Sequence, residues 1–225
     1  SAREALFPLY ACNIEVSLAP RVTQEPMIAE MRLQWWRDVC EEMQEGKAVR
    51  RHEVATPLAA AITAEDATLL DDLVAARRWD IYRDAFEDET HFDQYIDHTA
   101  GNLMWVAARS LGQADEKTVR DAAFGAGVAA FLQAIPQLVA QGRVPLLDGT
   151  DAGVSALARR ALDRLQSARS QRGSVSAAAR PALFPVGASA QVLQAAIKSP
   201  ERVGAGSLPD MNRFPLAWRA FSGRW

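Results

Sequence analysis

Aspartates at helical spacing are the side chains of this sequence that could do chemistry. Five of them share a spacing of four residues within two groups: Asp80, Asp84 and Asp88, then Asp93 and Asp97. Residues four apart lie on one face of a helix, so such a stripe could present several carboxylates to a divalent metal ion. A solvated helix face with Arg77 beside it explains the same spacing. That second interpretation is the more common one, and both stay open here.

Histidine and cysteine, the other usual metal ligands, form no recognisable site. None of the three histidines, His52, His91 and His98, is spaced from a cysteine or an acidic motif as metal ligands usually are. We expect them at the surface or at helix caps. Cys12 and Cys40 fall inside segments with helical periodicity, which indicates neither a zinc site nor a disulfide framework. A reducing compartment is the simplest expectation.

The length and charge of the chain exclude several classes of protein. At 225 residues the chain is expected to fold as a single domain spanning residues 1–225. A net charge of −3 gives no overall attraction to nucleic acid. We find no apolar stretch approaching the roughly 20 residues that span a bilayer, and no signal-peptide layout. The sequence therefore predicts a cytoplasmic protein without a transmembrane segment.

Helical periodicity dominates, which predicts an all-α fold. The predicted helices cover residues 25–45, 63–81, 90–109, 115–141, 151–170 and 214–221. Pro26 and Gly46 are placed to begin and end the first of them, and Thr63 with Asp66 resembles a helix N-cap. The helix at 115–141 is apolar nearly all round, as a central helix would be, and Pro136 should kink it or weaken its last turns.

Two adjacent tryptophans mark the first of these helices. Trp35 and Trp36 point about 100° apart on a helix. We expect one of them in the core and the other facing a groove or a partner.

Three segments, taken in order, resemble the squalene/phytoene synthase family. They are Arg3-Glu-Ala-Leu-Phe-Pro-Leu-Tyr-Ala-Cys-Asn13, Glu30-Met-Arg-Leu-Gln-Trp-Trp-Arg-Asp38, and the tract from Gly127 to Leu147 with Gly142-Arg143-Val-Pro-Leu-Leu at its end. Thr56-Pro57-Leu58, Asp80 and the segment from Tyr95 to Gly101 support the match. A weaker similarity covers residues 216–225, so the resemblance is strongest over residues 3–147.

The resemblance implies an isoprenoid-synthase-like helical bundle around a central cavity. The cavity or ligand positions that it suggests in this sequence are Asn13, Tyr95, Gly127, Gln133 and Arg143. Within the family, the Leu-Gln-Trp-Trp-Arg motif is most similar to the sequences of the bacterial relatives of a mitochondrial complex I assembly factor. That branch implies a respiratory complex subunit as partner, and it allows peripheral contact with the inner membrane.

The family's chemistry requires acids that this sequence lacks. Prenyl transfer in the family uses Mg²⁺, held by one D-x-x-x-D pair on each of two facing helices, to neutralise the departing diphosphate. The first pair should fall between Asn13 and Arg21, where the only carboxylate is Glu15. The second should precede Gly142, yet residues 126–143 contain no Asp or Glu, and Ala134 and Leu138 stand at the expected positions. We therefore predict that the magnesium chemistry is lost and that no cofactor is needed.

Three hypotheses about function follow. The leading one is a non-catalytic member of the family that acts by binding, in respiratory complex I assembly. The alternative is a Mg²⁺-dependent transferase acting on farnesyl or geranylgeranyl diphosphate, with Asp80, Asp84 or Glu15 as substitute ligands. The third is an isoprenoid lipid carrier, suggested by the apolar helix around Gly125 and Gly127.

Overall fold

The computed structural model describes residues 2–23, 25–82, 84–210 and 225. Within these residues the chain folds into ten α-helices joined by short 3-10 and π segments. The helices are α1 (Ala2–Leu18), α2 (Pro26–Gln44), α3 (Ala55–Ala61), α4 (Ala64–Ala76), α5 (Glu89–Ile96), α6 (Asn102–Leu111), α7 (Glu116–Ala140), α8 (Asp151–Ser170), α9 (Ser189–Lys198) and α10 (Glu201–Gly204). No strand occurs in this described part beyond one isolated bridge between Ala114 and Val175. The predicted all-α class is confirmed.

Local signals account for several helix boundaries. Pro26 begins α2, and Gly46, with φ of 67°, lies just past its end. Thr63 and Asp66 form a reciprocal capping box at the start of α4, as the sequence indicates. Asp115 caps α7, its carboxylate accepting a hydrogen bond from the amide of Thr118.

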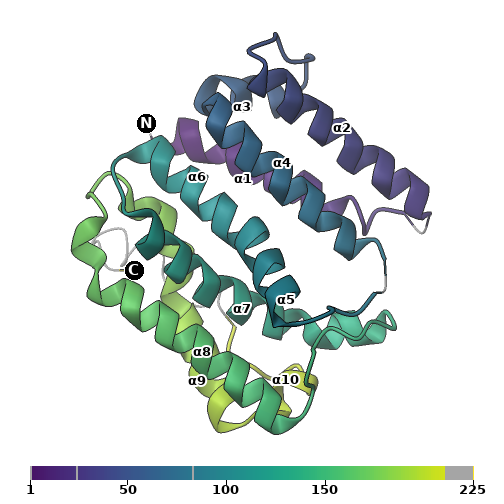
Figure 1. Ribbon diagram of the computed structural model, residues 1–225, viewed down its shortest axis with the longest axis vertical. Coiled ribbons are helices and arrows are strands. Elements are labelled where there is room, and N and C mark those ends of the chain that lie inside the picture. The colour runs from purple at the N-terminus through teal and green to yellow at the C-terminus, as the bar shows by residue number, and fades with distance from the viewer. Residues whose placement is uncertain (1, 24, 83, 211–224) are drawn as a thin grey trace.

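The helices form two groups that run in similar directions across the molecule (Figure 1). In the first group α2 packs on α4, while α1 packs on α3 and α6. In the second group α7 packs against α8, α9 and the π turn η2 (Asp97–Gly101). The two marked ends of the chain lie on the same side of the molecule (Figure 1).

The core lies along α7, whose buried side chains run from Thr118 to Ile135. Gly125 and Gly127 permit its close contacts, because a Cβ at Gly125 would lie 2.8 Å from the Cβ of Leu165, and one at Gly127 would lie 2.8 Å from the Cβ of Ala100. The helix continues four residues past Pro136, so the proline does not end it.

α7 bears on the expectation that the chain has no transmembrane segment. By length and composition alone it could cross a membrane, and it is the one helix of the described residues that could. Half of its most apolar 18-residue window is buried inside the fold. A core helix passes the same test, so this is weak support for a membrane span.

Two further segments differ from the expected helices. The helix expected at 63–81 ends as α4 at Ala76 and passes into the 3-10 turn η1 (Arg77–Asp80). The helix expected at 90–109 is α5, η2 and α6 in sequence. The amphipathic segment expected at 214–221 lies outside the described residues.

Candidate functional site

A polar cluster centred on Asp80 joins the two groups of helices. The Tyr95 hydroxyl donates a hydrogen bond to Asp80 Oδ1 at 2.9 Å. Arg77 Nη1 donates both to Asp80 Oδ2 and to the Tyr95 oxygen, each at 3.1 Å. Since Asp80 and Tyr95 come from η1 and α5, these bonds fasten one element to the other.

Arg143 completes the cluster from the far end of α7. Its Nη1 and Nη2 donate to the carbonyl oxygens of Asp80 and Trp79, at 3.1 and 2.5 Å. Its guanidinium carbon lies 3.8 Å from the Trp79 ring centroid, a cation–π contact. The residue is only 7% exposed, and its guanidinium group binds the backbone carbonyls of η1.

Burial shapes the electrostatics of this cluster. Desolvation, followed by the nearby Asp80 carboxylate, raises the pKa of Tyr95 well above its ordinary value. The hydroxyl therefore remains a hydrogen-bond donor at any physiological pH. With two guanidinium groups, one carboxylate and a neutral phenol, the cluster is well suited to holding the fold together.

The Tyr95 to Gly101 segment, which carries part of the family resemblance, contains the π turn η2. Thr99 Oγ1 donates to the Tyr95 carbonyl at 2.6 Å. A Cβ at Gly101 would lie 2.6 Å from Asp97 Oδ1, so glycine leaves room for that carboxylate. Asp97 in turn accepts from Arg120 Nη1 at 3.0 Å, which ties the turn to α7.

The expected acidic stripe does not exist as one helical face. Asp80 ends η1 and points into the cluster, whereas Asp84 is exposed in the connection that follows. Asp88 is the N-cap of α5, where its Oδ1 accepts from the amide of His91 at 2.8 Å. The stripe interpretation is wrong because the chain leaves the helical conformation after Asp80, which removes the regular four-residue alignment.

The two stretches expected to hold magnesium offer no ligand set. Ala134 and Leu138 lie half-buried on α7 and carry no oxygen donor. On α1, Glu15 is the only acid of its stretch, and its Oε2 lies 3.9 Å from His52 Nε2. Across the described ranges, no group of three or more His, Cys, Asp or Glu side chains could hold a metal ion. The residues present therefore do not fit the family's magnesium site.

The remaining cavity candidates are dispersed. Gln133 donates from Nε2 to the Pro209 carbonyl at 2.5 Å, so its amide fastens the segment after α10. Gly127 packs against Ala100 of η2. Asn13 is half-buried on α1, and its buried Oδ1 accepts no hydrogen bond from the described residues. Of the five candidates, the structure brings only Tyr95 and Arg143 together.

A groove of about 380 Å³ lies beside the C-terminal end of α1. We call it the α1–α2 groove, and its lining residues are Glu15, Leu18, Val22, Arg32, Trp35, Trp36 and His52. Trp36 is buried, at 3% exposure, while Trp35 is half-buried and faces the groove. Trp36 lies in the core, as expected for one of the two indoles, although both rings line the groove.

The hydrogen bonds of His52 indicate a structural role. Its Nδ1 accepts hydrogen bonds from the amides of Val54 and Ala55, at 3.2 and 3.4 Å, where α3 begins. This confirms the expected capping role. In the neutral ring the proton then resides on Nε2, the nitrogen that faces Glu15.

Sequence reasoning missed the most constrained members of the Asp80 cluster. Arg77 is treated from the sequence as a neighbour of a solvated stripe, and Trp79 is given no role. The three-residue spacing of Arg77 and Asp80 was the available signal, because it permits an ion pair within one turn. The contact from Arg143, 63 residues away in the chain, leaves no local signal.

Comparison with known proteins agrees with this architecture. The family model described as squalene/phytoene synthase matches residues 1–146. Among solved structures, the chain is similar to a dehydrosqualene synthase crystallised in complex with ligand, with a TM-score of 0.76 and 14% sequence identity. The alignment covers 99% of this chain and 85% of that one. No curated protein sequence matches the chain.

The structural likeness, at this low identity, concerns the fold, and it confirms the expected isoprenoid-synthase-like helical bundle. The family match extends over more than half of the sequence. The chain therefore belongs to the squalene/phytoene synthase family.

Proposed function

We propose that this chain is a non-catalytic member of its family that acts by binding a protein partner, in the assembly of respiratory complex I. The observation that supports the loss of catalysis most directly is the acid-free stretch at 126–143, with Ala134 and Leu138 at the expected aspartate positions. Departure of diphosphate needs a metal to neutralise its charge, and Mg²⁺ needs carboxylate oxygens to be held in place.

The proposed substitute ligands do not assemble into an alternative metal site. Asp80 is engaged by Tyr95 and Arg77, and Asp84 is exposed in a different segment. Glu15 lies on α1 beside His52. A transferase built on these three acids would need them to converge on one ion.

The choice of partner comes from the family resemblance of the segment Leu33-Gln-Trp-Trp-Arg37. The proposal places the chain in the cytoplasm, in peripheral contact with the inner membrane where respiratory complexes assemble. The lipid-carrier hypothesis receives less support, because Gly125 and Gly127 are occupied by contacts with Leu165 and Ala100.

The test of lost catalysis is a turnover assay. Purified full chain is incubated with radiolabelled farnesyl or geranylgeranyl diphosphate, Mg²⁺ and NADPH, beside an active squalene synthase as control. We expect no release of diphosphate above the protein-free background. Magnesium-dependent formation of a squalene-like or phytoene-like product would contradict the proposal.

The partner is tested separately in cells that lack the chain. We expect assembled complex I to fall and its intermediates to accumulate, with recovery when the chain is restored. An unchanged level of assembled complex would contradict the assembly role while leaving the loss of catalysis standing.

A further inference from the structure

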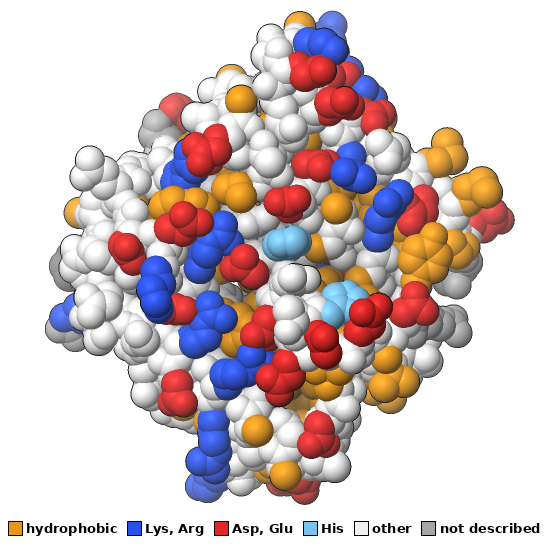
Figure 2. All heavy atoms as spheres, viewed as in Figure 1, with side chains coloured by type: hydrophobic (Ala, Val, Ile, Leu, Met, Phe, Trp, Pro, Cys, Tyr) orange, Lys and Arg blue, Asp and Glu red, His pale blue; other side chains and the backbone are white. Residues whose placement is uncertain are grey.

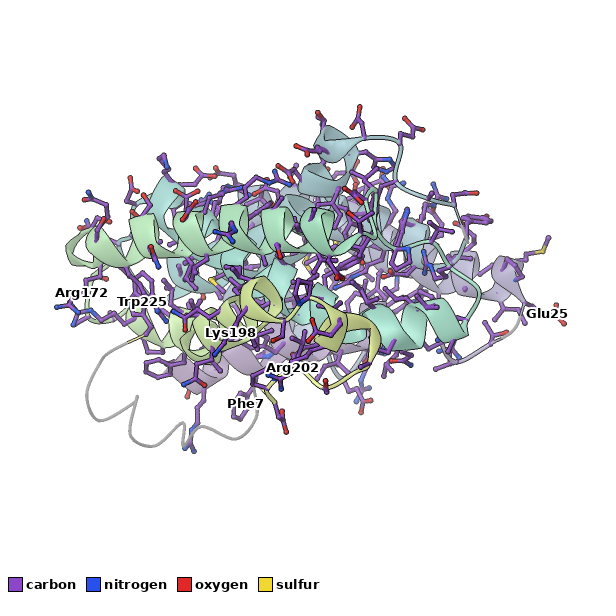
Figure 3. The ribbon with its side chains drawn as sticks, turned by 90° about the horizontal axis from the view of Figure 1, so that it is seen from below. Phe7, Glu25, Arg172, Lys198, Arg202 and Trp225 are labelled. Atoms are coloured by element: carbon purple, nitrogen blue, oxygen red, sulfur yellow. The ribbon has the colours of Figure 1, made fainter. Side chains whose placement is uncertain are left out.

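Exposed apolar side chains are concentrated in the second half of α1, the first half of α2 and the connection between them, and two of them, Leu18 and Val22, line the α1–α2 groove. Of the eleven large hydrophobic residues exposed in the described part, six lie between positions 14 and 31: Ile14, Leu18, Val22, Met27, Ile28 and Met31. Figure 2 shows hydrophobic side chains gathered at the right-hand edge, over the N-terminal end of α2, with acidic and basic side chains beside them. Phe7 is also exposed, but it lies well apart from Glu25 at the start of α2 (Figure 3), so we leave it out.

The groove has a fixed aromatic wall. The rings of Trp35 and Trp36 meet edge to face with centroids 5.0 Å apart, and His52 lies 4.8 Å from Trp35. Arg50 stacks over Trp35 at 5.5 Å and is itself held by two hydrogen bonds from its side chain to Glu42. These contacts restrict the indole, so a ligand would meet a preorganised surface.

The first turns of α2, which precede these tryptophans, carry two exposed methionines. Met27 and Met31 are 75% and 67% exposed on α2. Methionine is unbranched and polarisable, and it adapts to varied apolar side chains at binding surfaces. A rigid aromatic wall beside adaptable methionines favours a helix laid into a groove.

Charge distinguishes a protein segment from a lipid surface as the occupant. Between positions 14 and 32 there are three acids and two arginines, with no lysine. Binding to an anionic bilayer relies on an excess of basic residues, which this surface lacks. The groove instead offers one acid from α1, Glu15, and one base from α2, Arg32.

Glu15 is the specific element of this surface. Its side chain is 36% exposed, and among the residues that the structure describes its carboxylate has one ion-pair neighbour, His52, at 3.9 Å. A carboxylate that lines the same groove as two indoles is complementary to a guanidinium or ammonium group.

We propose that the α1–α2 groove docks an amphipathic helix of a partner protein, with apolar side chains on Leu18, Val22 and Trp35 and a basic side chain at Glu15. This inference rests on the proposed binding function and names the surface and the chemistry of the partner. An apolar stripe at helical spacing, with one Arg or Lys at its edge, is the sequence pattern that fits.

The experiment selects from a displayed library of randomised helical peptides on the immobilised full chain. We expect enriched peptides to carry Leu, Ile, Phe or Met at i, i+3 or i+4, and i+7, with Arg or Lys beside them. Their affinities are then measured with synthetic peptides, by tryptophan fluorescence. Leu18→Glu should weaken binding at least about tenfold, because it places a charge in the apolar wall.

Matched variants separate the groove from general effects. Glu15→Gln should lower the affinity for peptides that carry the basic residue about fivefold. The affinity for the same peptides with Arg replaced by Gln should not change. Two control variants, Val144→Glu and Glu201→Gln, make the same kinds of change in a different groove, which is lined by both of these residues. Neither control should change the affinity for the peptides. Circular dichroism checks that every variant folds.

Several outcomes would overturn the inference. They are the absence of any enriched peptide, enrichment without a basic residue, and equal affinity for Leu18→Glu. Vesicle binding that Leu18→Glu abolishes would identify a lipid surface instead, and a dimer that Leu18→Glu dissociates in sedimentation would identify a second copy. None of these results bears on prenyl turnover, so the loss of catalysis stands or falls separately.

Discussion

The segment from Arg77 to Gly101 and the acid-free stretch of α7 differ in how they use acidic side chains. In the first, Asp80 and Asp97 are bound by arginines from the same or another element, and Asp88 caps a helix. In the second, residues 126–143 carry no acid at all. Contacts within the fold use the first group of acids, whereas the stretch where the resemblance expects the family's second aspartate pair offers no carboxylate.

The difference teaches that the acids that hold this bundle together lie outside the stretch where the family resemblance expects metal-binding aspartates. The Asp80 cluster joins η1, α5 and the end of α7 without help from any metal ligand. Under the proposed function, the chain keeps this architecture without acids that would bind diphosphate. Variants of three aspartates in the first segment test this comparison, since each has a different environment.

Asp80→Ala is expected to have the largest effect. Removing this carboxylate leaves the guanidinium group of Arg77 in a mostly buried site without the acid that it pairs with. Breaking a buried ion pair in this way costs about 3–5 kcal/mol. Urea unfolding followed by circular dichroism measures the loss. A change in the free energy of unfolding below about 1 kcal/mol would show that the cluster does not hold the two groups of helices together.

Tyr95→Phe should have an intermediate effect. The substitution keeps the ring and removes the hydroxyl that donates to Asp80 and accepts from Arg77. We expect a loss of about 1–2 kcal/mol, because both partners are left with an unmade hydrogen bond. The same urea measurement detects it.

The pH dependence of the Tyr95→Phe variant provides a second check. Burial, and then Asp80, raise the pKa of Tyr95 in the folded state, while an unfolded tyrosine titrates near its ordinary value of about 10. The corresponding stability is present below that pH and is lost as pH rises above it. The wild-type chain should lose more stability than Tyr95→Phe between pH 9 and pH 11. Parallel pH profiles would contradict this assignment.

Asp88→Ala should cost less than either change at the cluster. Its carboxylate accepts one hydrogen bond, from the His91 amide at the start of α5. Loss of such a cap costs about 1 kcal/mol. Asp88→Asn keeps an acceptor at this position and should restore most of the stability, and failure of that rescue would argue against a capping role.

Asp84→Ala should have the smallest effect of the series. The residue is exposed, and surface substitutions away from caps and networks change stability by less than about 0.5 kcal/mol. A loss comparable to that of Asp80→Ala would indicate that Asp84 has a hidden structural partner, and it would weaken the contrast between the three acids.

Helix bounds were predicted well where they depend on capping residues and on hydrophobic periodicity within the helix itself. The bounds of α8, Asp151–Ser170, agree with the predicted range, and the capping box at Thr63 and Asp66 is present. Such features act within one turn of helix, so they need no knowledge of the tertiary structure.

Predictions from residue spacing were wrong where the tertiary structure departs from a continuous helix. The acids at 80, 84 and 88 have helical spacing, yet the chain leaves the helix after Asp80, and Phe86 in the following connection stacks on Trp79 with ring centroids 4.2 Å apart. The π turn within the segment predicted as one helix also follows from packing against α7. The absence of acids from 126–143 was readable from the sequence alone, whereas the α1–α2 groove required the relative placement of two helices.

The central claim is that the chain has lost magnesium-dependent diphosphate binding. The most direct test is thermal unfolding of the full chain with a non-hydrolysable farnesyl diphosphate analogue, with and without Mg²⁺. A ligand at 100 times its Kd stabilises the folded state by about 2.7 kcal/mol. Our account predicts the same midpoint with the analogue whether Mg²⁺ is present or absent. A midpoint that rises by several degrees only when both are present would contradict it.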